Sequence, residues 1–113
     1  DLFNLNQFTT GASFEVPTPT AGDGAVVLGD HRGQPHHWVG TFSGSGRVVR
    51  LYLDGDLGSS RDLMDPIQYA AIRESRIEIG DQLWEGRVYW AAIYERELTA
   101  LEVRALNEAG WQR

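Results

Sequence analysis

The sequence predicts an all-β fold that ends in one short α-helix. Short runs of β-branched and aromatic residues alternate with small polar residues and with 13 glycines, which is the pattern of brief strands joined by turns. Near the C-terminus, Thr99 and Glu102 have the spacing of a capping box, which marks the start of a helix. A chain of 113 residues, 42% of them apolar, suits one domain with one hydrophobic core.

Five strands are expected in the first half of the sequence. They span residues 3–8, 12–16, 25–28, 37–42 and 48–53. The prolines in segment 17–20 exclude a central strand there, because proline has no backbone N–H to donate. Within the fifth strand, apolar side chains alternate with Arg50 and Tyr52, which predicts one apolar face and one half-polar face. Asp54-Gly55 then gives a strong hairpin-turn signal.

The second half is less regular. Residues 56–75 are acidic and aperiodic, and we predict a loop there that can hold a short helical turn around residues 68–73. Residues 76–80 return to a strand with both isoleucines inward. Residues 86–94 are the longest strand candidate, and their nearly continuous apolar character predicts a central strand covered on both faces.

The C-terminal helix has both a start and a stop signal. It follows the capping box, and its apolar stripe combines Leu106 with Leu101 or Val103. Gly110 is predicted to close it in the left-handed conformation that glycine adopts at helix ends.

Composition excludes several classes of function. The ten basic residues, all arginine, face 16 acidic ones, and the net charge of −6 argues against nucleic acid as a partner. The chain has no cysteine, which excludes disulfides and thiolate metal sites. Apolar runs are far shorter than the roughly 20 residues that a membrane span needs. These features fit the cytoplasm and a bacterial cell envelope equally.

Four motifs in order resemble those of laminin-G-like domains, which belong to the concanavalin A-like lectin and glucanase jelly rolls. The motifs are HHWVGTF at 36–42, RLYLDG at 50–55, RIEIG at 76–80, and GRV at 86–88 followed by IYERELT at 93–99. The resemblance is best over residues 36–110. It implies an antiparallel two-sheet jelly-roll sandwich.

The resemblance also implies a function. Laminin-G-like domains are usually appended to larger secreted or envelope proteins, where they hold glycans or other proteins. We therefore expect a non-catalytic binding or assembly domain on the extracytoplasmic side of a bacterial cell, periplasmic, secreted or envelope-associated. A protein partner is the first expectation, a carbohydrate the second and a glucanase-type hydrolase a distant third. The opening strands of the family have no counterpart here, so we expect a longer chain or a second polypeptide to complete the sandwich.

Aromatic side chains are the candidate binding residues. Trp and Tyr stack on sugar rings and are enriched at protein interfaces. The candidates for ligand or partner binding are Trp84, Tyr89, Trp90, Trp111 and Tyr52.

Metal and catalytic candidates are weaker. The hard oxygen ligands of Asp54, Asp56, Asp62 and Asp65 could suit calcium, although their spacing matches no known calcium loop. The neighbours His36 and His37 point to opposite faces of a strand, which favours a packing role over metal binding. Glu78 and Asp81 also point to opposite faces, unlike the paired carboxylates of a glycosidase. No catalytic residue is assigned.

Overall fold

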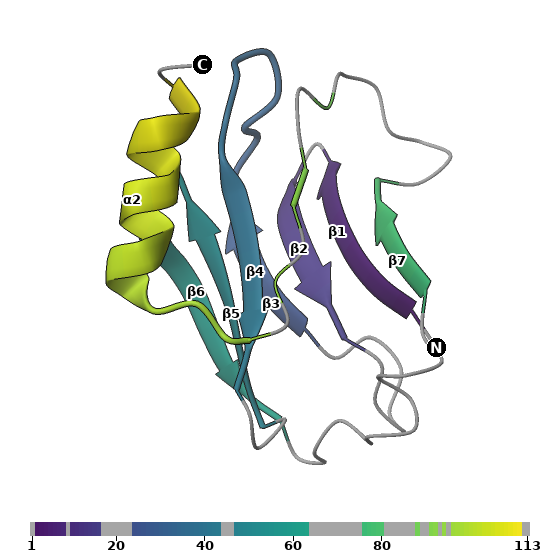
Figure 1. The fold of residues 1–113 in the computed structure, drawn as a ribbon. Coiled ribbons are helices and arrows are strands. Elements are labelled where there is room, and N and C mark those ends of the chain that lie inside the picture. Colours follow the sequence, from purple (N-terminus) through teal and green to yellow (C-terminus); the bar gives the residue numbers. More distant parts are fainter. Residues whose placement is uncertain are drawn as a thin grey trace.

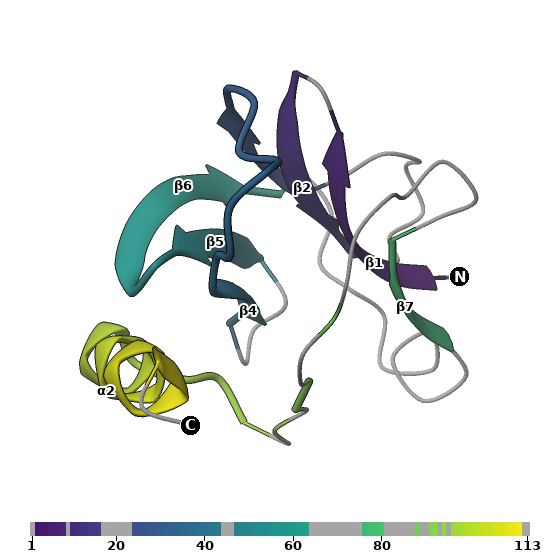
Figure 2. The same cartoon turned by 90° about the horizontal axis from the view of Figure 1, so that it is seen from above.

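Two β-sheets and one helix form the fold in the computed structural model of the protein (Figure 1). The described residues are 2–8, 10–16, 24–43, 47–63, 76–80, 88, 91–92, 94 and 96–111. Seen from above, the helix lies outside one sheet, and the second sheet lies on the other side (Figure 2). The all-β prediction with a single C-terminal helix is confirmed for this part of the chain.

The larger sheet has the strand order β3-β2-β1-β7. Its strands are β1 (Leu2–Phe8), β2 (Gly11–Glu15), β3 (Gly24–Leu28) and β7 (Arg76–Ile79). β1–β2 and β2–β3 are antiparallel, as hairpin-connected neighbours are expected to be.

The β1–β7 pair is parallel, so the expectation of a purely antiparallel fold is wrong at this edge. The long chain between the two strands removes the hairpin constraint that would force antiparallel pairing. The side chain of Asn4 fixes the register, because its Nδ2 donates to Glu78 Oε1 at 3.2 Å and to the Gly80 carbonyl at 3.1 Å. Ile79 pairs with Leu5 on the inner face as predicted, yet it is 42% exposed.

The smaller sheet has the order β4-β5-β6. Its strands are β4 (Trp38–Phe42), β5 (Val48–Leu53) and β6 (Asp56–Asp62). β6 corrects the prediction of a loop from residue 56 onward; the helical turn expected at 68–73 lies outside the described residues. The sequence of β6 has a single apolar residue, Leu57, so its pairing follows from the turn before it.

That turn is a two-residue hairpin. Asp54 and Gly55 both have positive φ, 51° and 89°, and Leu53 pairs with Asp56 across the turn. Positive φ at both central positions gives the type I′ geometry, whose twist matches that of the flanking strands. The predicted hairpin turn at Asp54-Gly55 is confirmed.

The main core lies between the sheets. Its buried members are Phe3, Ala12, Val16, Ala25, Val49, Leu51 and Leu63. The ring of Phe3 stacks between Phe14 at 6.4 Å and Phe42 at 5.3 Å, measured between ring centroids. Gly40 is required because a Cβ there would lie 2.6 Å from Cδ1 of Phe14, well inside van der Waals contact. The sheets therefore pack face to face.

A second, smaller core lies under helix α2 (Ala100–Trp111). Tyr52, Leu98 and Val103 are buried there, so both faces of β5 are covered. The apolar stripe uses Val103 and not Leu101, which is 77% exposed. Among the described residues, no helix is long and apolar enough to cross a membrane.

The predicted capping box is confirmed, whereas the predicted helix stop is wrong. The Thr99 N–H donates to Glu102 Oε1 at 3.0 Å, and the Glu102 N–H donates to Thr99 Oγ1 at 3.2 Å. Gly110 stays helical and lacks positive φ, since the helix continues to Trp111. A helical glycine costs only about 1 kcal/mol relative to alanine, so its presence does not force an end.

The strand predicted at residues 86–94 is wrong at every described position. Val88, Ala91, Ala92 and Tyr94 lie outside strands and are exposed. The other residues of this segment lie outside the described residues.

Candidate functional site

The five predicted aromatic residues are not gathered into one site by the described structure. Trp84, Tyr89 and Trp90 lie outside the described residues, and so does the side chain of Trp111. Tyr52 is only 4% exposed, because its ring lies in the core under α2 with Leu98 and Val103. Tyr52 is therefore a core residue, and its ring is not available for stacking on a ligand.

Three of the four predicted calcium ligands can be placed, and they do not lie together. Asp54 and Asp56 lie at the β5–β6 turn, whereas Asp62 lies at the other end of β6. Asp56 and Asp62 are six residue steps apart along the strand, which is about 20 Å. Asp65 lies outside the described residues. Within the described part of the chain, no three His, Asp or Glu side chains are grouped so that they could hold a metal ion.

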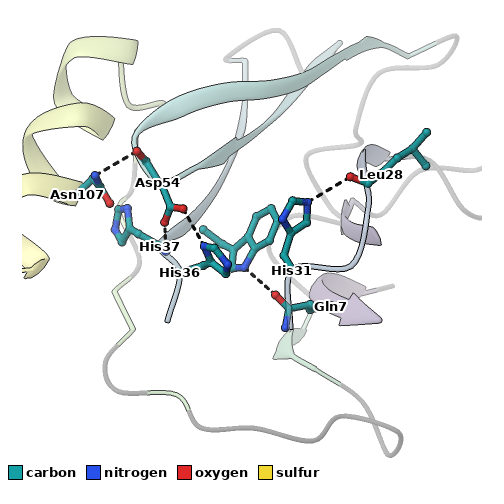
Figure 3. A network of polar contacts seen from close by, with 8 residues as sticks. Gln7, Leu28, His31, His36, His37, Asp54 and Asn107 are labelled. Atoms are coloured by element: carbon teal, nitrogen blue, oxygen red, sulfur yellow. Dashed lines mark hydrogen bonds and ion pairs between the residues drawn. The ribbon is translucent and has the colours of Figure 1, made fainter. Parts of the chain in front are cut away.

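Asp54 instead joins three elements (Figure 3). Its Oδ2 lies 2.7 Å from His36 Nδ1, and its Oδ1 accepts from the His37 N–H at 2.9 Å. Its own N–H donates to the His37 carbonyl at 2.8 Å. Its carbonyl accepts from Asn107 Nδ2 on α2 at 3.1 Å. One turn residue thus ties the start of β4, the β5–β6 hairpin and the helix together.

The two neighbouring histidines have different surroundings. In Figure 3 the ring of His36 lies toward His31, and the ring of His37 lies on the side of Asn107. Burial lowers the pKa of His37 below its ordinary value of 6.5, and the nearby Asp54 carboxylate opposes this with a smaller effect. His37 is therefore held in its neutral form.

His36 also packs against other rings. Its centroid lies 5.7 Å from that of His31 and 6.3 Å from that of Trp38. The Trp38 Nε1 donates to Gln7 Oε1 on β1 at 3.2 Å, which links the two sheets. His36 and Asp54 contact each other, and Asp54 connects the start of β4 with the β5–β6 turn and α2.

A different surface stands out at the outer strand of the larger sheet. β3 has the sequence Gly-Ala-Val-Val-Leu, which carries no charge, and it forms ladder pairs only with β2 among the described strands. β6 of the other sheet lies close to it, and Arg61 of β6 donates to the Gly24 carbonyl. Ala25 and Val27 face the core, whereas Val26 is 46% and Leu28 80% exposed on the outer face. We name this surface, formed by Val26 and Leu28, the β3 edge; Gly24, at the start of the strand, is buried. The β3 edge was not among the predicted site residues, although the uncharged apolar run of β3 is visible in the sequence.

The backbone direction along β3 follows from one hydrogen bond. Gly29 N–H donates to the Thr10 carbonyl at 3.0 Å, so the groups of residues 25, 27 and 29 point toward β2. Those of Gly24, Val26 and Leu28 point away from β2. Two of these outward carbonyls accept from side chains: Gly24 from Arg61 Nη1 at 3.4 Å, and Leu28 from His31 Nε2 at 3.2 Å. Val26 lies between these two residues along the strand.

A shallow depression lies beside the helix. It is lined by Tyr94, Arg96, Leu98, Glu102, Ala105, Leu106 and Ala109. Tyr94 is 46% exposed. Arg96 donates to both carboxylate oxygens of Glu102, and this contact, followed by the Thr99 N–H, lowers the pKa of Glu102 to about 2. The depression therefore combines an exposed ring with a fixed ion pair.

Comparison with known proteins found no matching family model, curated protein or solved structure. The resemblance to laminin-G-like domains accordingly stays a prediction.

Proposed function

We propose that this chain is a non-catalytic binding and assembly domain that binds a protein partner along the β3 edge. The observation that supports this proposal most directly is an uncharged outer strand with Leu28 80% exposed and Val26 46% exposed. Outer strands of soluble proteins usually carry charged residues, prolines or bulges that prevent pairing with another chain. β3 has no charge and no proline, and its register with β2 is regular.

Protein binding at this edge has a clear physical basis. A strand that adds to a sheet edge gains main-chain hydrogen bonds, and alternate side chains provide specificity. Val26 and Leu28 are two residues apart and therefore project from the same face. Full burial of one such aliphatic side chain contributes roughly 1.5–3 kcal/mol. An edge of this kind suits a partner that supplies an extended apolar segment.

The wider proposal includes fold family and location. We propose a laminin-G-like jelly-roll sandwich in an extracytoplasmic or envelope-associated complex, on the support of the four motifs described above. The non-catalytic assignment is supported by the polar groups themselves. His36 and Asp54 bind the β4 start to the hairpin, and Glu78 accepts a hydrogen bond from Asn4. Fractionation of the source cells tests the location, and recovery in the cytosolic fraction would contradict it.

Site-specific photo-crosslinking in the native source tests the proposed binding surface. A benzophenone amino acid is placed at Leu28 and, as a matched control, at Leu101, which is similarly exposed at 77%. We expect a protein adduct of defined mass at position 28 only. Excess unlabelled wild type should compete for it, and Leu28→Lys should not. Equal labelling at both positions, or no protein adduct at position 28, would refute the proposal.

Carbohydrate binding is the second candidate, because the depression beside α2 places the exposed Tyr94 next to the Arg96–Glu102 pair. Sugar sites commonly combine a solvent-facing ring with polar groups that fix orientation. A glycan array with wild type and Tyr94→Ala tests this. A saturable signal that Tyr94→Ala abolishes would support it, and wild type without any glycan signal would exclude it.

A further inference from the structure

We infer that the cavity at the start of α2 binds a small zwitterion, namely a free α-amino acid with an aliphatic side chain. The cavity has a volume of about 410 Å³ and lies between β5, β6 and the chain that leads into α2. Ligand pockets commonly measure about 300–1,000 Å³, so this volume suits a small molecule. The cavity belongs to the smaller sheet and the β3 edge to the larger one, so the inference does not rest on the proposed function.

The inner part of the cavity is apolar. Tyr52 and Leu98 are buried and form its floor. Leu57 pairs with Tyr52 across β5 and β6 and forms a wall, with 53% of its surface exposed. An aliphatic group placed in the cavity would remove part of this apolar surface from water, which is favourable. The cavity therefore suits a ligand that carries one apolar side chain.

The hydroxyl of Tyr52 supplies an unused polar group at the same place. Tyr52 is 4% exposed and lines the cavity, yet no described residue forms a hydrogen bond with its hydroxyl. A buried tyrosine O–H usually has a partner, because an unpaired buried polar group costs free energy. The hydroxyl therefore points to a hydrogen-bond acceptor supplied by a ligand, and a carboxylate oxygen is such an acceptor.

The ion pair beside the cavity also has unused groups. Arg50 Nη1 donates to Glu97 Oε2 at 3.1 Å, and neither side chain forms another hydrogen bond with a described residue. Further guanidinium donors and Glu97 Oε1 are thus available to a ligand. By contrast, the Arg96–Glu102 pair beside the other depression uses both carboxylate oxygens, one of which also accepts from the Thr99 N–H.

An α-amino acid matches these groups in charge and in spacing. Covalent geometry places its ammonium nitrogen and nearer carboxylate oxygen about 3 Å apart, close to the 3.1 Å between Arg50 Nη1 and Glu97 Oε2. Its carboxylate would accept from Arg50 and from the Tyr52 hydroxyl, and its ammonium would donate to Glu97. A carboxylate without the ammonium would leave Glu97 beside a like charge. The aliphatic side chain would then occupy the apolar part of the cavity.

NMR titration of the isotope-labelled full-length protein with L-leucine tests the inference. We expect saturable shifts of the backbone amides of residues 50, 52, 57 and 97–100. Three related compounds should each bind at least about tenfold more weakly. Isocaproate lacks the ammonium, leucinamide lacks the carboxylate charge, and glycine lacks the apolar side chain. This ligand series uses wild type alone, so it does not depend on the folding of any variant.

Substitutions locate the site. Tyr52→Phe removes only a hydroxyl that has no described partner, so it should raise the dissociation constant for leucine about tenfold and leave the free energy of unfolding nearly unchanged. Arg50→Gln should raise the dissociation constant by at least as much. Arg104→Gln is the matched control, because Arg104 forms an exposed ion pair with Asp56 and does not line the cavity.

Three results would overturn the inference. The first is the absence of saturable shifts with L-leucine up to about 10 mM, a concentration at which even a millimolar complex would be mostly formed. The second is equal affinity for leucine and isocaproate, which would exclude recognition of a zwitterion. The third is unchanged affinity in both Tyr52→Phe and Arg50→Gln, with the variants folded by circular dichroism. None of these results bears on crosslinking at Leu28, so the proposed function can stand or fail separately.

Discussion

Substitution of Asp54 tests the junction that links β4, the β5–β6 turn and α2. Asp54→Ala removes the carboxylate that contacts His36 Nδ1 and the His37 N–H at 2.7 and 2.9 Å. It also places alanine at φ 51°, which asparagine and aspartate tolerate better. Asp54→Asn keeps one acceptor oxygen and the turn preference and removes only the charge. Comparison of the two variants therefore separates the contribution of the turn conformation to stability from that of the carboxylate charge.

The expected loss in the free energy of unfolding follows from these contacts. A hydrogen bond to a charged group contributes roughly 1.5–3 kcal/mol, and the left-handed conformation costs alanine roughly 1–2 kcal/mol. The Asp54 side chain is 40% exposed, so we discount the His36 ion pair to at most about 1 kcal/mol. The effects overlap, and we expect Asp54→Ala to lower the free energy of unfolding by about 3 kcal/mol. Asp54→Asn should lower it by about 1 kcal/mol.

Urea unfolding, followed by circular dichroism, measures both values. Asp56→Ala is the matched control, because Asp56 lies at the end of the same turn and makes only an exposed ion pair with Arg104. Such pairs contribute about 0–1 kcal/mol. If Asp54→Ala destabilised the protein no more than Asp56→Ala, the reasoning about the junction would be refuted.

Four further substitutions or conditions test the fold. In Gly40→Val the new side chain would clash with the Phe14 ring, and we expect the melting temperature to fall by several degrees. An unchanged melting temperature would contradict the tight contact between the sheets. Thr99→Ala should cost about 1 kcal/mol in urea unfolding, with Thr99→Ser as the control that keeps the cap, and equal losses in both would argue against capping. The lowered pKa of His37 means that the unfolded chain binds a proton more readily, so stability should fall as pH drops below 6.5, and His37→Gln should flatten this slope. The lowered pKa of Glu102 should cause a further loss as pH falls from 4.5 toward about 2, which Glu102→Gln should remove.

The elements that could be predicted from sequence are those whose own side chains specify them. β5 alternates apolar and polar residues, and the helix start has a capping box with both reciprocal hydrogen bonds. β6 could not be predicted in this way, since six of its seven residues are exposed and its pairing depends on the turn at Asp54. Gly110 misled the prediction because a helix can contain a glycine near its end.

The candidate site was harder to predict for a physical reason. Sequence alone predicts that an apolar strand is buried, and only the position of the strand in the sheet decides whether it is exposed. β3 lies at the outside because β7 pairs with β1, which is a contact between segments more than 70 residues apart. The role of Asp54 was visible only in part. Its turn was predicted, but its contact with Asn107 on α2 joins residues 53 positions apart.

The parallel pair of β1 and β7 also has a consequence for the order of folding. The β5–β6 hairpin needs only adjacent residues, so it can form as soon as it leaves the ribosome. β1 is made before β7, so its partner on one side, Arg76–Ile79, is synthesised much later. Contacts of such sequence separation form slowly because the loop must close first. During synthesis β1 therefore keeps one open edge until β7 has emerged, and in this interval that edge can pair with other chains.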